Sequence, residues 1–179
     1  MRFAGCAALL AFVLCGCTPM PDSYAPPVQR QPALAGEAPK AAKKLLRMSE
    51  AETDAYIVQD IPKGANGPWR WAGKKPTVRI FLANTAAADP NTVVLVEYSV
   101  ADATFKDTGP VAFQFFLNGQ KIGEERQSKP GAFSFSKTAP PGLLKPGENE
   151  IAVEVDKPWK SPADGAELGF ILTSIGFVQ

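Results

Sequence analysis

Short runs of alternating apolar and polar residues fill the chain from residue 54 to its end. A period of two places every second side chain on the same face of a β-strand. The runs with this period are 78–82, 94–100, 111–117, 133–135 and 151–155. Clusters of Gly, Pro, Asn and Asp separate them at the spacing of a sandwich. The pattern predicts an all-β domain over residues 53–179, a single antiparallel β-sandwich of jelly-roll or immunoglobulin-like type that needs no helix.

Several details of that domain follow from local sequence. Residues 54–61 are rich in β-branched side chains and are predicted to form a strand, and residues 168–178 are apolar on both faces, as in a central strand. Asn118-Gly119 predicts a tight hairpin, because a type I′ turn needs two residues with positive φ. Pro146-Gly147 predicts a second turn.

The first residues have the layout of an export signal. Arg2 precedes an apolar run over residues 3–14, which is too short for a membrane span of about 20 residues. Leu14-Cys15-Gly16-Cys17 resembles the bacterial lipobox, which implies removal of residues 1–16 and a diacylglyceryl group on the Cys17 thiol. Thr18 rather than Asp after this Cys implies sorting to the outer membrane, with the protein lipid-anchored there and facing the periplasm.

Residues 17–52 are predicted to form a tether. Six prolines lie between residues 18 and 39 among small and polar residues, and such a stretch cannot bury enough apolar surface to fold. Residues 40–48 are predicted to form a short helix with a basic cluster. This cluster contacts anionic lipid in one interpretation and is simply solvated in the other, and we favour the second because each charge adds only about 1 kcal/mol at a membrane surface.

Two motifs carry a further resemblance. The sequence FLNGQKIGE at 116–124, followed by LLKPGENEIAVEV at 143–155, resembles the hairpin and strand of sugar-binding-like jelly-roll modules that flank bacterial glycoside hydrolases. Residues 157–170 resemble the end of β-sandwich domains appended to bacterial glycosyltransferases, and the whole chain is similar to small envelope lipoproteins of acidobacterial type. These resemblances imply the sandwich fold and bring no catalytic residue.

Composition narrows the chemistry. The chain has no His, and its 19 Lys and Arg against 18 Asp and Glu give a formal charge of +1, so we expect neither His-based catalysis nor nucleic-acid binding. No spacing among the acidic residues selects a catalytic pair, and no D-x-D-x-D loop supports a calcium site. We therefore expect a protein that is not an enzyme and that holds no metal or cofactor. The acidic residues considered are Asp102, Asp107, Glu124, Glu125, Asp156 and Asp164, with Asp89 and Asn91 as further calcium ligands.

The three Trp residues are the candidate binding residues. Trp69-Arg70-Trp71 places two indoles on one strand face, and Trp159 lies in a Pro-bounded loop. An indole makes a stacking platform for a sugar, but large aromatic side chains are more often buried, and we favour burial for Trp69 and Trp71. The candidate ligand residues are Trp159, Trp69, Trp71, Arg70, Lys157 and Lys160. The sequence thus favours a lipid-anchored, non-catalytic module for a carbohydrate or cell-envelope glycan; the alternative is an assembly lipoprotein that docks a protein partner in the periplasm.

Overall fold

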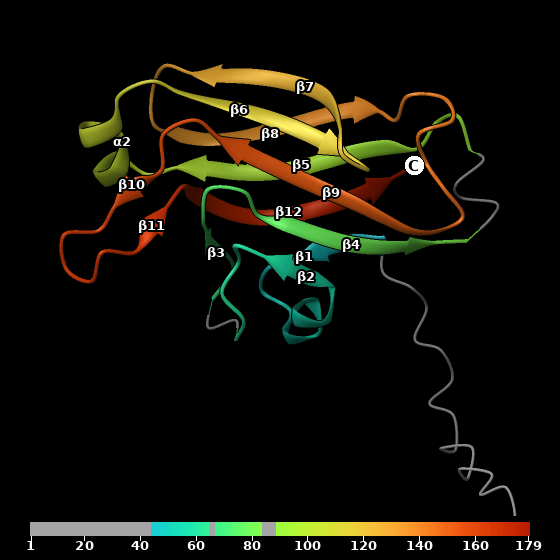
Figure 1. Ribbon diagram of the computed structural model, residues 1–179, viewed down its shortest axis with the longest axis horizontal. Coiled ribbons are helices and arrows are strands. Elements are labelled where there is room, and N and C mark those ends of the chain that lie inside the picture. The colour runs from blue at the N-terminus through green and yellow to red at the C-terminus, as the bar shows by residue number, and fades with distance from the viewer. Residues whose placement is uncertain (1–43, 65–66, 84–88) are drawn as a thin grey trace, which may run out of the picture. The chain divides into compact units, whose positions relative to one another are not determined.

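The computed structural model describes residues 44–64, 67–83 and 89–179 (Figure 1). The predicted signal peptide, Cys17 and most of the predicted tether lie outside these residues. The described residues contain two five-stranded antiparallel sheets, whose strands cross in two layers in Figure 1. The prediction of an all-β sandwich is therefore confirmed.

The two sheets are named here by their strands. The first sheet has the order β1 (Leu45–Arg47), β12 (Phe170–Val178), β5 (Val93–Val100) and β8 (Gly131–Thr138), and β3 (Arg70–Ala72) also pairs with β12. The second sheet has the order β2 (Ile57–Gln59), β4 (Thr77–Leu82), β9 (Gly147–Val155), β6 (Val111–Leu117) and β7 (Gln120–Gln127). A separate ribbon pairs β10 (Trp159–Lys160) with β11 (Glu167–Leu168). Two helices complete the described elements, the 3₁₀ helix η1 (Ala51–Tyr56) and α2 (Asp102–Thr108).

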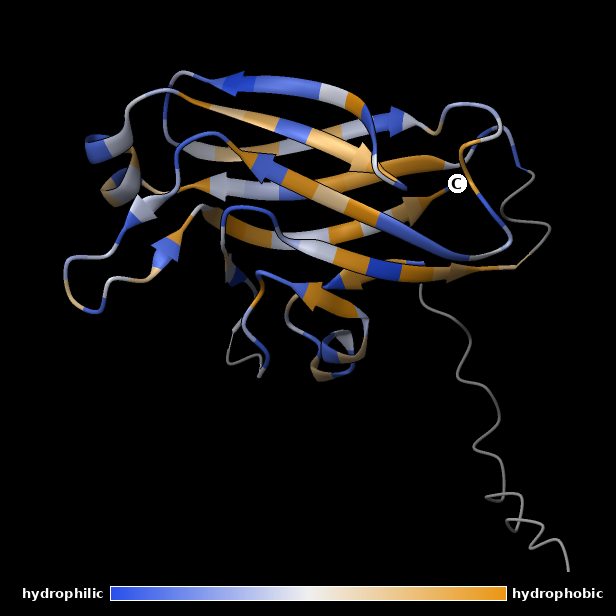
Figure 2. Cartoon of the chain, in the orientation of Figure 1, coloured by the Kyte–Doolittle hydropathy of each residue, from blue (hydrophilic) through white to orange (hydrophobic). Residues whose placement is uncertain are grey.

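The core lies between the two sheets. Along β6, buried and half-buried positions alternate strictly, whereas β7 is mostly hydrophilic (Figure 2). Tyr98 of the first sheet contacts Phe113 and Phe115 of the second, with ring centroids 4.7 and 6.0 Å apart. The Tyr98 hydroxyl donates to Glu125 and accepts from Gln127, each at 2.8 Å, which joins the two sheets near β7.

The motifs at 116–124 and 143–155, which resemble those of jelly-roll modules, have a structural role in the sandwich. Asn118 and Gly119 have φ of 50° and 81°, which confirms the hairpin turn between β6 and β7. The Asn118 side chain donates to Leu143 O at 2.8 Å and to Asn149 Oδ1 at 2.9 Å. Asn149, completely buried, donates in turn to Lys145 O at 2.7 Å. Asn118 and Asn149 therefore attach the 143–147 loop to the hairpin by hydrogen bonds.

The amino-terminal part of the domain differs from the prediction. Residues 45–47 form β1 instead of a helix, because their backbone pairs with the edge of β12 and Leu46 and Met48 are completely buried. The predicted strand at 54–61 is reduced to β2, and η1 precedes it. Thr53 in η1 is buried and donates its hydroxyl to Arg47 O at 2.7 Å. The folded domain therefore includes residues before 53.

The prediction that no helix is needed is also wrong, since α2 connects β5 to β6. This helix carries the chain from the first sheet to the second, and it ends where Gly109, with φ of 66°, donates to Phe105 O. The predicted central strand is confirmed, because β12 pairs with β5 on one side and with β1 and β3 on the other.

Candidate functional site

The candidate site lies where the loop before β3 meets the edge of the first sheet. β3 pairs with the first part of β12, with Trp71 opposite Ile171. Trp69 lies just before β3 and keeps 44% of its surface exposed. The rings of Trp69 and Trp71 meet edge to face, with centroids 6.1 Å apart and planes at 84°. The structure thus leaves one indole open to solvent and fixes it against a second.

A hollow of about 400 Å³ opens beside these indoles. Its described lining consists of Pro62, Gly64, Gly67, Pro68, Trp69, Arg70 and Trp71. A second hollow of about 360 Å³ shares Pro62 and Trp71 with the first. The second is lined in addition by Asp60, Ile61, Ala72, Gly73, Ala166, Glu167 and Leu168. We call the two hollows together the Trp groove. It runs from an apolar end at Trp69 to an end that carries two carboxylates.

Arg70 forms the support beneath the groove. Its side chain is only 4% exposed, and its guanidinium donates to Met48 O at 2.9 Å, to Glu50 O at 3.2 Å and to Pro62 O at 3.3 Å. It also forms an ion pair with Asp54 of η1. The sequence grouped Arg70 with the ligand residues, whereas the structure turns it inward, where it joins Met48, η1 and Pro62 to β3.

Asp54 extends this support to Gly64, which lines the first hollow. Its carboxylate accepts a hydrogen bond from the Gly64 N–H at 2.9 Å in addition to the one from Arg70. The hydrogen bond from Arg70, followed by that from Gly64, lowers the pKa of Asp54 below its ordinary value. The carboxylate is therefore ionised at neutral pH and holds one wall of the first hollow.

Asp60 shapes the carboxylate end of the groove. Its backbone has φ of 57°, a left-handed conformation that Asp tolerates better than most residues. Its carbonyl accepts from Gly73 N–H at 2.7 Å and its Oδ2 accepts from Lys75 N–H at 2.8 Å. A Cβ on residue 73 would lie 3.2 Å from the Asp60 Cβ, so glycine allows this close contact. These contacts fix the direction of the Asp60 carboxylate.

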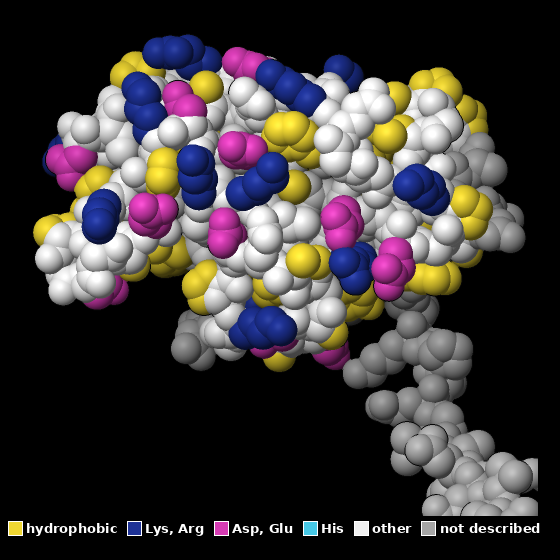
Figure 3. All heavy atoms as spheres, viewed as in Figure 1, with side chains coloured by type: hydrophobic (Ala, Val, Ile, Leu, Met, Phe, Trp, Pro, Cys, Tyr) yellow, Lys and Arg dark blue, Asp and Glu magenta, His cyan; other side chains and the backbone are white. Residues whose placement is uncertain are grey.

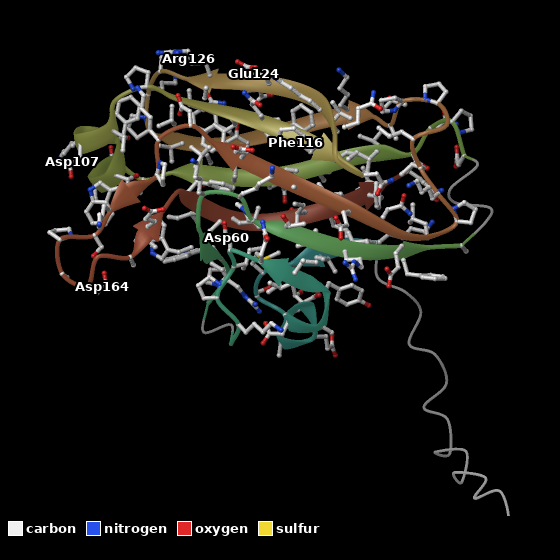
Figure 4. The ribbon with its side chains drawn as sticks, viewed as in Figure 1. Asp60, Asp107, Phe116, Glu124, Arg126 and Asp164 are labelled. Carbon is white, nitrogen blue, oxygen red and sulfur yellow. The ribbon has the colours of Figure 1, made fainter. Side chains whose placement is uncertain are left out.

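Trp159 lies outside the Trp groove. Its indole N–H donates to Asp107 Oδ2 of α2 at 2.6 Å, which attaches β10 to that helix. Lys157 donates to Pro110 O at 3.2 Å, and Lys160 is exposed on β10 opposite Glu167. Asp107 and Asp60 lie well apart in Figure 4, at α2 and near β3. The structure therefore brings Trp69 and Trp71 together in the groove, whereas Trp159 and Lys160 lie on β10, paired with the groove residues Leu168 and Glu167, and do not line either hollow.

Sequence reasoning missed Asp60, Pro62 and Glu167. Pro62 and Pro68 both line the first hollow, and these two prolines are a local signal in the sequence that points to this region. Glu167 reaches the groove only because β11 leads directly into β12, next to β3. That proximity depends on sheet order, which no local pattern contains.

The outer face of the second sheet has a different character. Oppositely charged side chains alternate over it, as Figure 3 shows, and several form ion pairs across strands. Arg79 lies 2.8 Å from Glu150, and Lys75 lies 3.1 Å from Glu154. The Lys75 ammonium also lies 5.0 Å from the centroid of the Phe116 ring. This face is a network of exposed charges, in contrast with the apolar end of the Trp groove.

Within residues 44–64, 67–83 and 89–179, no group of three or more acidic or Cys side chains is placed to hold a metal ion. Among the helices of those same segments, none has the length and apolar character to cross a membrane.

Comparison with known proteins gives distant structural similarities. No family model matches the chain, and no curated protein sequence matches it. The CBM36-1 domain of a multidomain xylanase from the hindgut metagenome of Trinervitermes trinervoides has 9% identity and a TM-score of 0.40, over 75% of this chain and 95% of that one. CBM35 from Paenibacillus barcinonensis has 14% identity and a TM-score of 0.39, over 76% of this chain and 99% of that one.

A third similar structure is a much longer protein. Dimeric latent PorU from Porphyromonas gingivalis has 11% identity and a TM-score of 0.42, over 79% of this chain, which spans only 13% of PorU. All three TM-scores are below 0.5. Scores this low carry no functional inference.

Proposed function

We propose that the protein is a non-catalytic carbohydrate-binding module and that the Trp groove is its binding site. The observation that carries this proposal is the exposed indole of Trp69, fixed edge to face against Trp71 at the open end of a hollow. An exposed large aromatic side chain costs solvation free energy, and clusters of them commonly mark a binding surface. A sugar ring suits this surface because its C–H face packs on an indole.

The far end of the groove suits the hydroxyl groups of the same ligand. Asp60 and Glu167 line the second hollow, and carboxylates accept hydrogen bonds from hydroxyl groups. A mostly apolar hollow with a few placed polar groups is the usual composition of a small-ligand site. Because the hollows share Pro62 and Trp71, a ligand of more than one sugar ring fits the groove better than a single ring does.

Binding assays with defined glycans test this proposal. The probes are purified peptidoglycan sacculi, soluble chitin oligosaccharides and soluble xylan. We expect at least one to bind, and we expect Trp69→Ala to weaken that binding by tenfold or more, about 1.4 kcal/mol. Phe81→Ala is the matched control, since Phe81 is 53% exposed on β4, outside the groove. Absence of binding to every probe, or equal losses in the two variants, would contradict the proposal.

Tryptophan fluorescence gives an independent readout. In a Trp159→Phe background the remaining emission comes from Trp69 and Trp71, so a glycan in the groove shifts or quenches it. Reducing sugar released in the same samples is measured as well, because its release reports hydrolysis and the fluorescence change reports binding. Cleavage of a bound glycan would overturn the non-catalytic part of the proposal.

The proposal also includes a lipid anchor at Cys17 that holds the module at the periplasmic face of the outer membrane. Its support is the lipobox-like sequence Leu14-Cys15-Gly16-Cys17. Labelling of cells with radioactive palmitate should mark the chain and the Cys15→Ser variant, but not Cys17→Ser. Label that persists in Cys17→Ser would exclude this anchor. Fractionation of the same cells tests the outer-membrane location.

A further inference from the structure

The outer edges of the two sheets differ in how they are protected against pairing with another strand. An open edge presents unpaired N–H and C=O groups, and short strands, charges and bulges normally block it. β1, β2 and β3 have three residues each. β7 is long, but it carries four charged side chains and a register shift against β6. These four strands are therefore protected.

β8 lacks this protection. It has eight residues, contains no proline, and carries Lys137 as its single charged side chain. Its register with β5 is continuous from Gly131 to Thr138, without a bulge. Within the described segments its other side has no strand partner. Ala132, Ser134 and Ser136 are exposed, so small side chains flank the open edge.

We propose that a second copy of this chain pairs with β8 in antiparallel orientation, about a two-fold axis at Ser134. The sequence of β8 is nearly symmetric about this residue. Phe133 and Phe135 flank it on one face of the sheet, and Ala132 and Ser136 flank it on the other. Directly opposed residues of antiparallel strands share a face, so this register opposes Phe133 to Phe135 of the second copy and Ala132 to Ser136.

Charge favours the antiparallel arrangement. In the Ser134-centred register each Lys137 lies opposite Gly131 of the other copy, so the two ammonium groups are at opposite ends of the strand pair. An in-register parallel arrangement would oppose the two lysines, and like charges directly opposite are destabilising. A two-fold contact uses the same residues on both copies, which the near-symmetric sequence of β8 provides. The contact leaves Trp69 and Trp71 free, so it is independent of glycan binding.

Disulfide trapping tests the register. In the full chain with Cys6, Cys15 and Cys17 replaced by Ser, Ser134→Cys places two thiols at the axis, with Cα atoms about 4.5–5.5 Å apart, within disulfide range. Ser136→Cys is the matched control, because the two substituted residues are offset by four positions, about 13 Å. We expect mild oxidation to give a covalent dimer of the first variant and little of the second. Equal trapping, or trapping of neither, overturns the proposal.

Sedimentation velocity tests the association without cross-linking. We expect the average mass of the cysteine-free chain to rise with concentration, and Ser134→Lys to weaken association several-fold by opposing two ammonium groups at the axis. Ser136→Lys faces Ala132 of the other copy and should have a smaller effect. Thermal unfolding of each variant checks that the exposed substitutions leave the fold intact. A monomer at every concentration, or a larger effect of Ser136→Lys, overturns the proposal.

Discussion

Phe115 of β6 and Phe135 of β8 stack face to face across the core, with centroids 3.7 Å apart and planes at 3°. The stack connects the two sheets beside β7. Phe135 also lies against Gly123 of β7, which faces Phe115 in the register of the second sheet. One glycine therefore makes room for an aromatic contact that joins the layers.

We expect Gly123→Ala to lower the free energy of unfolding by about 1–3 kcal/mol, the usual cost of overpacking a core. A Cβ at residue 123 would lie 2.6 Å from Phe135 Cε2, so the ring must move and the stack with Phe115 is disturbed. Urea denaturation followed by circular dichroism measures the change. Gly67→Ala is the control, because a Cβ there meets nothing within 4 Å. Equal effects of the two substitutions would contradict the expectation.

We expect Arg70→Met to destabilise the domain by about 3 kcal/mol. Methionine retains much of the side-chain volume but removes the donor to Met48 O, at about 1–3 kcal/mol, and the ion-pair partner of Asp54. Arg79→Met is the control, since Arg79 is exposed and such ion pairs contribute less than about 1 kcal/mol. Denaturant titration gives both values. If the two variants are equally stable, Arg70 does not have the supporting role assigned to it.

Acid should weaken the domain partly through Asp54. Folding lowers the pKa of Asp54 below its ordinary 3.8, mainly through the hydrogen bond from Arg70. A lowered pKa stabilises the folded state above the unfolded value, and this stabilisation is lost as pH falls below 3.8 towards the folded value. The unfolding free energy of Asp54→Asn should therefore decrease less steeply in this acid range than that of the unsubstituted chain.

The measurement is a series of urea titrations between neutral pH and acid. Asp164 is the comparison, because its pKa is also lowered, mainly by a hydrogen bond from Ser161 in the β10–β11 turn. Asp164→Asn should remove a separate contribution to the pH dependence of stability. The unfolding free energy of the double variant should therefore fall less steeply with acid than that of either single variant. An unchanged acid slope in Asp54→Asn would show that the ion pair with Arg70 does not stabilise the fold in solution.

We expect Asn149→Asp to destabilise the domain more strongly at pH 7 than in mild acid. The buried Asn149 amide donates to Lys145 O and Gly147 O, at 2.7 and 3.1 Å. An ionised carboxylate there loses both donors and faces two carbonyl oxygens, at a cost of about 1–3 kcal/mol or more. Protonation restores one donor, so the difference from the unsubstituted chain should narrow as pH falls. A pH-independent difference would contradict this reasoning.

The alternating pattern was sufficient to predict the sandwich. A strand that buries one face has an apolar side chain at every second residue, and this pattern can be recognised within a short segment. The run from Val111 to Leu117 shows this, since its predicted core face is the buried one. Residues 45–47 show the limit. Their sequence favours a helix, yet the open edge of β12, about 130 residues further along the chain, makes them a strand.

The candidate site was predictable only in part. The period of two placed Trp69 and Trp71 together with Arg70 on the opposite face, as observed. The predicted burial of the Trp face was wrong, since Trp69 is 44% exposed and Arg70 is the buried residue. An Arg is rarely buried unless several acceptors surround it. Those acceptors, at Met48, Glu50 and Pro62, come from three other segments. The hydrogen bond from Trp159 to Asp107 could not be predicted for the same reason, since the two residues are 52 positions apart.

The end-to-end placement of β1 and β3 along one edge of β12 has a mechanical consequence. β1 pairs with the last residues of β12, and β3, which carries Trp71, pairs with the first. A pull between the chain that enters at Lys44 and a ligand held in the Trp groove would pass along β12 and load both sets of hydrogen bonds in shear. Shear requires many hydrogen bonds to break together, whereas peeling breaks them one at a time. β12 would therefore carry tension between the entry of the chain at Lys44 and the groove, in parallel with the contacts of Arg70 to Met48, Glu50 and Pro62.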